Sequence, residues 1–293
     1  MPDYEFSQVD CVVYDPEPNV RRLVRDVLGA LRMTKVQLCG SVAELRKTLQ
    51  HATPPDLVIA DCGGDDGEVF KTFSLLRQGA YGGNPFAGLI ATAFNPTQQM
   101  LGRVTNCGAD ALLVKPVAPR QIRDRIVGLV ESARNFVVTA DYVGPDRRKG
   151  PREGAQIPLV EVPNTLRLKA TGTADKVDPK ELIDAAFAEI NDRRLERLAF
   201  QAAFLIEFAR PGLAGGSIDR LSVDHLARVP AVIEDLIRHV PRHAEAEQPH
   251  AVTLARGLVA GAEDARATLL DRGPPVDLAP LLNDAIGLVV EGA

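Results

Sequence analysis

The sequence predicts an α/β protein with a doubly wound five-stranded parallel sheet, followed by an all-α helical domain. From residue 8 to about residue 131, apolar runs of strand length alternate with helical patterns. These runs are continuously apolar, as expected for strands that helices cover on both faces. From Asp178 onward the pattern is helical. Alternating strands and helices imply parallel strands that are joined by right-handed crossovers.

Each strand of the expected sheet is a short apolar run, and an amphipathic segment follows it. The strands are expected at residues 11–15, 35–40, 56–61, 88–93 and 111–116. The helices are expected at residues 18–33, 41–52, 67–79, 97–108 and 118–133. In the first helix, apolar residues three or four apart form one stripe: Val20, Leu23, Val24, Val27, Leu28 and Leu31. We therefore place the first domain at residues 1–133.

Residues 134–175 are predicted to be a Gly/Pro/Arg-rich linker. The stretch YVGPDRRKGPREG, residues 142–154, gathers glycine, proline and like charges. Two apolar pieces flank it, at residues 135–139 and 156–163, and either pair as strands or pack on a domain surface. The cations of this stretch suggest either phosphate binding or a solvated turn, and the solvated turn is favoured: Arg147, Arg148, Lys149 and Arg152.

Residues 176–293 are predicted to be a helical output or dimerisation domain. Asp178 and Pro179 suit an N-cap and a first helical residue, and Pro211-Gly212 is expected to end that helix. Apolar residues cover this helix on all sides, which requires burial in a bundle or at a dimer interface. We therefore expect a homodimer through this domain.

Three further helices complete the expected bundle. The second helix has an apolar seam that Pro230 is expected to kink: Leu226, Val229, Ile233, Leu236 and Val240. The last two helices are expected at Pro249–Leu270 and Leu278–Val290.

The composition indicates a cytoplasmic protein. The chain has 293 residues, 45% of them hydrophobic and 25% charged, which suits two soluble globular domains. No run approaches about 18 apolar residues and the N-terminus has no apolar signal region, so neither membrane insertion nor secretion is expected. Four scattered cysteines suit free thiols in a reducing compartment. The net charge of −5 gives no sign of nucleic-acid affinity.

Polar residues follow four of the expected strands. Asp15, Asp61 and Thr92 stand at the ends of the first, third and fourth strands, and Lys115 stands at the end of the fifth. Doubly wound sheets bind ligands at the carboxyl ends of their strands, so these side chains are expected in one crevice. Two carboxylates, a hydroxyl and an ammonium are the groups that bind Mg²⁺ and a phosphoryl group.

Residues 8–131 resemble the receiver domain of bacterial two-component response regulators. The resemblance is carried by YDPEPNVRRLV (14–24), PDLVIAD (55–61), NPFAGLIATA (84–93) and GADALLVKP (108–116). It implies a flavodoxin-like sheet with strand order 2-1-3-4-5. It also implies a cis peptide bond between Lys115 and Pro116.

The resemblance assigns a role to each residue of the crevice. Asp61 would accept a phosphoryl group from a sensor histidine kinase or a phosphotransfer protein. Asp15, Asp61 and the backbone carbonyl of Gly63 would hold Mg²⁺. Lys115 would pair with the carboxylate or the phosphate, and Thr92 would bind a phosphate oxygen.

Three departures from the family pattern bear on this site. Pro16 replaces an acid that usually contacts the metal, so weaker Mg²⁺ binding is expected, with the adjacent Glu17 as a further candidate ligand. The loop after Asp61 is about two residues shorter than usual and carries Asp65 and Asp66. Leu112 stands where many receivers have an aromatic residue.

The histidines of the helical domain do not indicate catalysis. His225 and His250 lack the acid-rich motif of kinase dimerisation helices, and no nucleotide-binding region follows. His239 and His243 have the spacing of a metal pair on a helix, but Pro241 lies between them and favours a solvated loop. No acid and amide with a phosphatase-like spacing are found on the long helix.

The charge of the helical domain opposes DNA binding. Residues 176–293 contain 13 Lys and Arg against 19 Asp and Glu. We therefore expect output through a downstream protein partner. The sequence predicts a response regulator that is phosphorylated on Asp61, not a separate enzyme. The alternatives are a pseudo-receiver scaffold that works without phosphorylation and, less favoured, a DNA-binding regulator.

Overall fold

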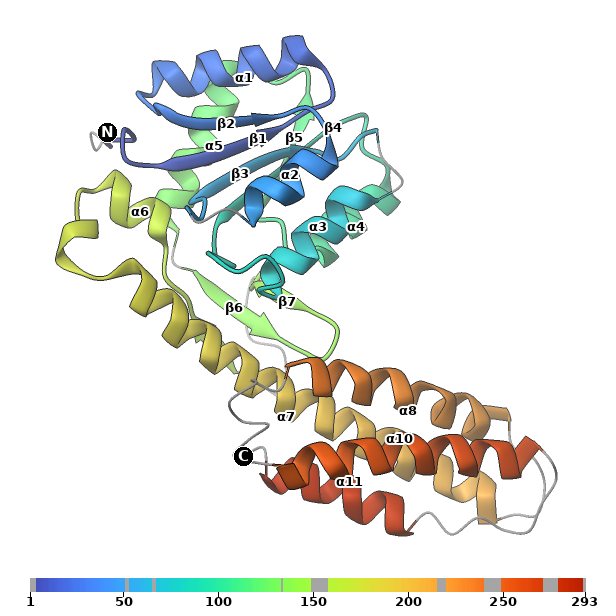
Figure 1. The fold of residues 1–293 in the computed structure, drawn as a ribbon. Coiled ribbons are helices and arrows are strands. Elements are labelled where there is room, and N and C mark those ends of the chain that lie inside the picture. The colour runs from blue at the N-terminus through green and yellow to red at the C-terminus, as the bar shows by residue number, and fades with distance from the viewer. Residues whose placement is uncertain are drawn as a thin grey trace. The chain divides into compact units, whose positions relative to one another are not determined.

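The computed structural model describes residues 4–50, 53–64, 67–132, 134–148, 158–214, 220–239, 249–270 and 279–291 (Figure 1). The chain divides into two compact units, Met1–Phe187 and Ala188–Ala293, and each is described by itself. The first unit thus includes the segment that the sequence suggests as a linker and the first turns of the long helix that follows.

The first unit is built on the predicted parallel sheet. Its strands are β1 (Asp10–Tyr14), β2 (Lys35–Cys39), β3 (Leu57–Asp61), β4 (Gly88–Phe94) and β5 (Ala111–Lys115). They pair in the order β2-β1-β3-β4-β5, and every pairing is parallel. This confirms the predicted fold class and strand order.

Helices cover both faces of this sheet. They are α1 (Pro18–Ala30), α2 (Val42–Leu49), α3 (Glu68–Arg77), α4 (Gln98–Asn106) and α5 (Pro119–Glu131). One buried cluster joins α1 and α5 to the sheet through Val24, Leu28 and Ile126. A second cluster, with Leu45 and Phe73, joins α2, α3 and α4 to the other face. The central strands are therefore shielded on both sides, which explains why they are continuously apolar.

Three short strands and a helix follow the sheet within the first unit. Strands β6 (Asn135–Val138), β7 (Val143–Pro145) and β8 (Leu159–Glu161) form an antiparallel sheet with the order β7-β6-β8. The two flanking pieces thus pair as strands, one of the two arrangements expected. Helix α6 (Thr165–Ala170) and a short 3₁₀ turn, η1 (Ala174–Lys176), come next.

The remaining described helices are α7 (Pro179–Ala214), α8 (Arg220–His239), α10 (Pro249–Leu270) and α11 (Ala279–Glu291). Asp178 caps α7 as predicted, because its Oδ1 accepts from the Lys180 backbone N–H at 2.8 Å. The predicted end at Pro211-Gly212 is wrong, since α7 continues to Ala214. A proline removes only its own N–H bond from the helix, and this loss does not stop the chain from continuing for one more turn. Val240 and Leu278 lie outside the described residues.

The second unit buries the predicted seam of α8 but leaves part of α7 exposed. Leu226, Val229 and Ile233 are fully buried. On α7, Phe200, Phe204 and Phe208 are 61%, 50% and 58% exposed, although the sequence suggests burial on all sides. They are four residues apart, so they share one face of the helix. No described helix is long and apolar enough to cross a membrane.

The cysteines are free thiols inside the first unit. Cys11, Cys39, Cys62 and Cys107 are all buried. Burial raises the pKa of Cys11, Cys39 and Cys107 above that of an ordinary thiol. At neutral pH these three are therefore protonated and unreactive.

Candidate functional site

The parallel sheet gathers the four predicted side chains at its carboxyl edge. Asp15 directly follows β1, and Asp61 and Lys115 are the last residues of β3 and β5. Thr92 lies beside Asp61 in the β3–β4 register, and Phe94 lies beside Lys115 in the β4–β5 register. Asp15, Asp61, Thr92 and Lys115 are all buried. The four side chains therefore lie at one edge of the sheet, and three of them, Asp15, Thr92 and Lys115, line a cavity of about 150 Å³.

Lys115 joins the two acids of this site. Its Nζ lies 2.5 Å from Asp15 Oδ2 and 2.6 Å from Asp61 Oδ1. One ammonium thus stands between two carboxylates, so this group of three carries one excess negative charge. In a buried site, an excess negative charge favours a further cation. The Lys115–Pro116 peptide bond is cis, as the resemblance implies.

The acidic loop is held by backbone contacts and by Arg21. The Glu17 backbone N–H donates to Asp15 Oδ1 at 2.9 Å. Arg21 Nη1 donates to the backbone carbonyls of Asp15 and Pro16. Both oxygens of Asp15 therefore have donors. Glu17 occupies the N-cap position of α1 without a side-chain capping bond, and only its backbone N–H contacts Asp15.

Asp61 and Thr92 keep hydrogen-bonding capacity that the described residues do not use. Asp61 Oδ1 accepts from Lys115, while no described residue donates to Asp61 Oδ2. Within the same described residues, no partner contacts the Thr92 hydroxyl, whose backbone carbonyl accepts from the Cys62 N–H at 2.8 Å. One carboxylate oxygen and one hydroxyl, on residues paired across neighbouring strands, thus keep open hydrogen-bonding capacity.

Glycine at position 63 fits a close approach to this site. A Cβ on Gly63 would lie 3.6 Å from Asp61 Oδ1 and 3.7 Å from the Phe94 backbone nitrogen. These are ordinary contact distances, so the backbone after β3 passes directly beside the carboxylate. Asp65 and Asp66 of the same loop lie outside the described residues.

Phe94 is a member of the site that sequence reasoning missed. Its ring centroid lies 5.2 Å from Lys115 Nζ, within the range of a cation–π contact. The side chain is 56% exposed, so it covers the ammonium from the solvent side. Its position in the sequence could have indicated this role, because Phe94 is the last residue of the strand that carries Thr92.

The donor set fits Mg²⁺ with few protein ligands. Asp15 and Asp61 offer two carboxylates that share one ammonium, and the Gly63 carbonyl lies on the adjoining loop. Magnesium takes hard oxygen ligands and commonly uses only one or two carboxylates with water and phosphate. The described residues hold no group of three or more His, Cys, Asp and Glu suited to a metal.

Comparison with known proteins adds no family to this picture. No protein family model matches the chain, and no curated protein matches it. The five-stranded sheet and its strand order are compatible with a receiver domain.

Proposed function

We propose that this protein is a two-component response regulator whose receiver accepts a phosphoryl group on Asp61. One observation carries the proposal: the buried Lys115 Nζ lies between Asp15 and Asp61, and Thr92 stands next to Asp61 on the neighbouring strand. Receiver chemistry needs a carboxylate nucleophile, a cation for the developing charge and a hydroxyl for a phosphoryl oxygen.

The proposed reaction moves a phosphoryl group from nitrogen to oxygen. Asp61 Oδ2, which has no donor among the described residues, attacks the phosphorus of a phosphohistidine. The new O–P bond forms as the N–P bond breaks, and the imidazole nitrogen leaves with the electron pair of that bond. Lys115 stabilises the negative charge on the transferred group, and Thr92 donates to one of its oxygens.

Asp15, Asp61 and the Gly63 carbonyl would hold Mg²⁺ here, with Glu17 as a further candidate. When bound, Mg²⁺ supplies positive charge for the phosphoryl oxygens. Asp15 already accepts from Lys115 and from the Glu17 backbone N–H, so a metal must share its oxygens with these donors. We expect weak binding in consequence.

The direct test is a phosphate-retarding gel of the full chain with Mg²⁺ and acetyl phosphate. The wild type is expected to give a retarded band, and Asp61→Asn is expected to give none. Asp56→Asn is the matched control, because Asp56 directly precedes the same strand, at its opposite end. A band that persists in Asp61→Asn would refute Asp61 as the acceptor.

A specific observation favours a second candidate, a pseudo-receiver scaffold. Lys115 pairs with both carboxylates, and Pro16 supplies no side-chain ligand. The scaffold predicts no retarded band and no measurable Mg²⁺ affinity in the folded wild type. Pro16→Asp separates the two candidates, since a working receiver should gain at least about tenfold in Mg²⁺ affinity and keep its band.

For the output, we propose protein contacts of the helical unit, including a homodimer. The exposed aromatic face of α7, formed by Phe200, Phe204 and Phe208, is the supporting observation. Large apolar side chains on one helix face suit a protein interface. Light scattering of the full chain should give the dimer mass, and Phe204→Glu should give the monomer mass. A wild-type monomer at all concentrations would refute the homodimer.

A further inference from the structure

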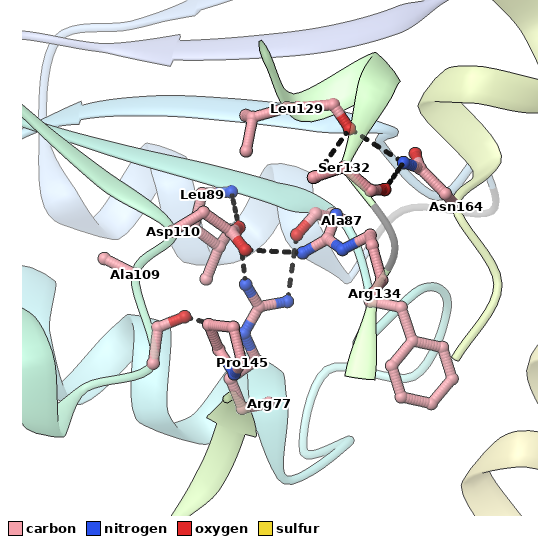
Figure 2. A network of polar contacts seen from close by, with 12 residues as sticks. Arg77, Ala87, Leu89, Ala109, Asp110, Leu129, Ser132, Arg134, Pro145 and Asn164 are labelled. Atoms are coloured by element: carbon pink, nitrogen blue, oxygen red, sulfur yellow. Dashed lines mark hydrogen bonds and ion pairs between the residues drawn. The ribbon is translucent and has the colours of Figure 1, made fainter. Parts of the chain in front are cut away.

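A second cluster of buried charges lies at the amino edge of the sheet, outside the candidate functional site (Figure 2). Asp110 directly precedes β5 and lies between two arginines. Arg77 Nη2 donates to Asp110 Oδ2 at 2.9 Å, and Arg134 Nη2 donates to Oδ1 at 2.7 Å. The side chains of Arg77, Arg134 and Asp110 are 0%, 3% and 7% exposed. This cluster therefore holds one excess positive charge.

Arg77 is fully engaged within the protein. Besides Asp110, it donates to the backbone carbonyls of Gly108, Pro85 and Ala87. Burial lowers the pKa of Arg77 to about 10, although the carboxylate of Asp110 acts in the opposite direction. The guanidinium is still charged at neutral pH, and its donors have partners. The unused hydrogen-bond donors of the cluster therefore belong to the other arginine.

Arg134 has unused donors that face a cavity. Among the described residues, its guanidinium donates to Asp110 alone, and its Cζ lies 5.8 Å from the centroid of the Phe136 ring. A guanidinium has five N–H donors, so most of those of Arg134 remain available. This side chain lines a cavity of about 490 Å³. A buried cation with open donors beside a cavity indicates an anion site.

The other charges around this cavity strengthen the same conclusion. Two acids of its wall already have partners, because Asp124 pairs with Arg120 and Asp146 pairs with Arg148. Two cations of the wall, Arg125 of α5 and Arg147 after β7, have no carboxylate partner among the described residues. Arg147 donates instead to the backbone carbonyl of Ala109. The cavity therefore offers three guanidinium groups to an anion: those of Arg125, Arg134 and Arg147.

We propose that this cavity binds a small molecule that bears a phosphate or diphosphate group. Guanidinium forks match the oxygens of phosphate in pairs, and about 490 Å³ lies within the range of small-ligand sites. Leu129 and Pro145 add apolar wall for the rest of the ligand. Under this proposal, the cations that the sequence places in residues 147–152 do not only form a solvated turn, because Arg147 and Arg148 line the binding cavity. Lys149 and Arg152 of this stretch lie outside the described residues.

The test is isothermal titration calorimetry of the full chain with sodium pyrophosphate at constant ionic strength. A chelator in the buffer removes divalent metal, so the Asp61 site does not contribute. The wild type is expected to bind with a dissociation constant of about 1 mM or tighter. Arg125→Gln should weaken binding about tenfold through the loss of one charged contact. Arg25→Gln makes the same charge change on α1, which does not line this wall, and should bind like the wild type.

A second pair of variants tests the cavity itself without removing charge. Gly128 lies in α5 on the cavity wall, and a Cβ there would meet nothing within 4 Å. Gly128→Leu should therefore fill part of the cavity and weaken pyrophosphate binding about tenfold or more. Gly102→Leu is the matched control, because Gly102 lies in α4 with equal space and does not line the cavity.

The outcomes decide the proposal separately from the proposed function. No saturable binding by the folded wild type would overturn it. Equal weakening by Arg125→Gln and Arg25→Gln would overturn it too, since only net charge would then matter. If Gly128→Leu binds pyrophosphate with wild-type affinity, the ligand binds elsewhere and the proposal is overturned. Asp61→Asn should keep full pyrophosphate affinity, because the phosphoacceptor lies at the opposite edge of the sheet.

Discussion

At each end of β1 and β3, two aspartates are bridged by one lysine, but the surroundings of the two groups differ. At the carboxyl end, Lys115 bridges Asp15 and Asp61 at 2.5 and 2.6 Å. At the amino end, Lys169 of α6 bridges Asp10 and Asp56, both at 2.7 Å. Two Asp–Lys–Asp groups thus stand at opposite edges of one sheet, separated by strands of five residues or about 16 Å.

The two groups differ in the residue that the neighbouring strand, β4, places beside them. Beside Asp61, β4 presents the hydroxyl of Thr92, whereas at the amino edge β4 begins with Gly88, which has no side chain. Asp56 is also tied into the backbone, because its Oδ2 accepts from the Asp10 N–H at 2.9 Å. The amino-edge group therefore fastens α6 to the sheet. The comparison teaches that a lysine between two acids does not by itself indicate phosphoryl chemistry.

The largest expected difference between the two groups is in phosphoryl acceptance. Lys115→Met should lower the initial rate of labelling by acetyl phosphate about 100-fold, because a preorganised cation is lost from the reacting centre. Lys169→Met should leave that rate within about twofold of the wild type. The measurement is densitometry of the retarded band over time. Equal loss in both variants would mean that Lys115 acts only through folding.

The next difference is in stability. Lys169→Met should lower the free energy of unfolding by about 2 kcal/mol, since it leaves two carboxylates together without their cation. Urea denaturation followed by circular dichroism measures this change. Adding Asp56→Asn to Lys169→Met should restore part of the loss by removing one of those charges. A double variant that is less stable than Lys169→Met would contradict this explanation.

A smaller difference is expected in alkaline solution. Burial lowers the pKa of Lys169, but Asp56 and Asp10 together outweigh it, so the net pKa is raised above the ordinary lysine value. The folded state then holds this proton more tightly than the unfolded state does. The stabilisation is complete below about pH 10.4 and is lost as pH rises through the higher pKa of the folded protein. The urea midpoint of Lys169→Met should therefore fall less steeply above that pH than that of the wild type.

The smallest effect is expected from Gly63→Ala at the carboxyl edge. The added Cβ would meet its nearest atom, Asp61 Oδ1, at 3.6 Å, which is an ordinary contact. The free energy of unfolding, measured by urea denaturation, should change by no more than about 0.5 kcal/mol. The initial rate of labelling by acetyl phosphate should fall no more than about threefold. A complete loss of labelling with intact stability would show that the phosphoryl group needs the space beside this glycine.

The sequence predicts the sheet and most of the candidate site because both depend on local pattern. Each strand is an apolar run, and a polar residue near its last position lies at the carboxyl edge. Asp61, Thr92 and Lys115 were therefore identifiable without long-range information. The five parallel strands follow from the same alternation, whereas their order was implied by the resemblance to receiver domains.

The contacts that the sequence does not reveal are those between distant residues. Lys169 reads as a surface lysine, and its contact with Asp10 spans 159 positions. Arg77 reads as a cation in the last turn of a helix, yet it is completely buried because β5 and the following strands close over it. Phe94 falls just beyond the strand expected at residues 88–93, although it lies over Lys115. Pro211 reads as a helix end because a local rule cannot tell the last turn from the interior.

The buried cysteines make this protein convenient for spectroscopy. All four thiols are buried, and burial raises the pKa of Cys11, Cys39 and Cys107. A maleimide dye at neutral pH should therefore react slowly with the native chain. A single cysteine introduced at an exposed position, such as Ala30→Cys, would then carry nearly all of the label, and changes around that position could be followed by its fluorescence without removing any natural thiol.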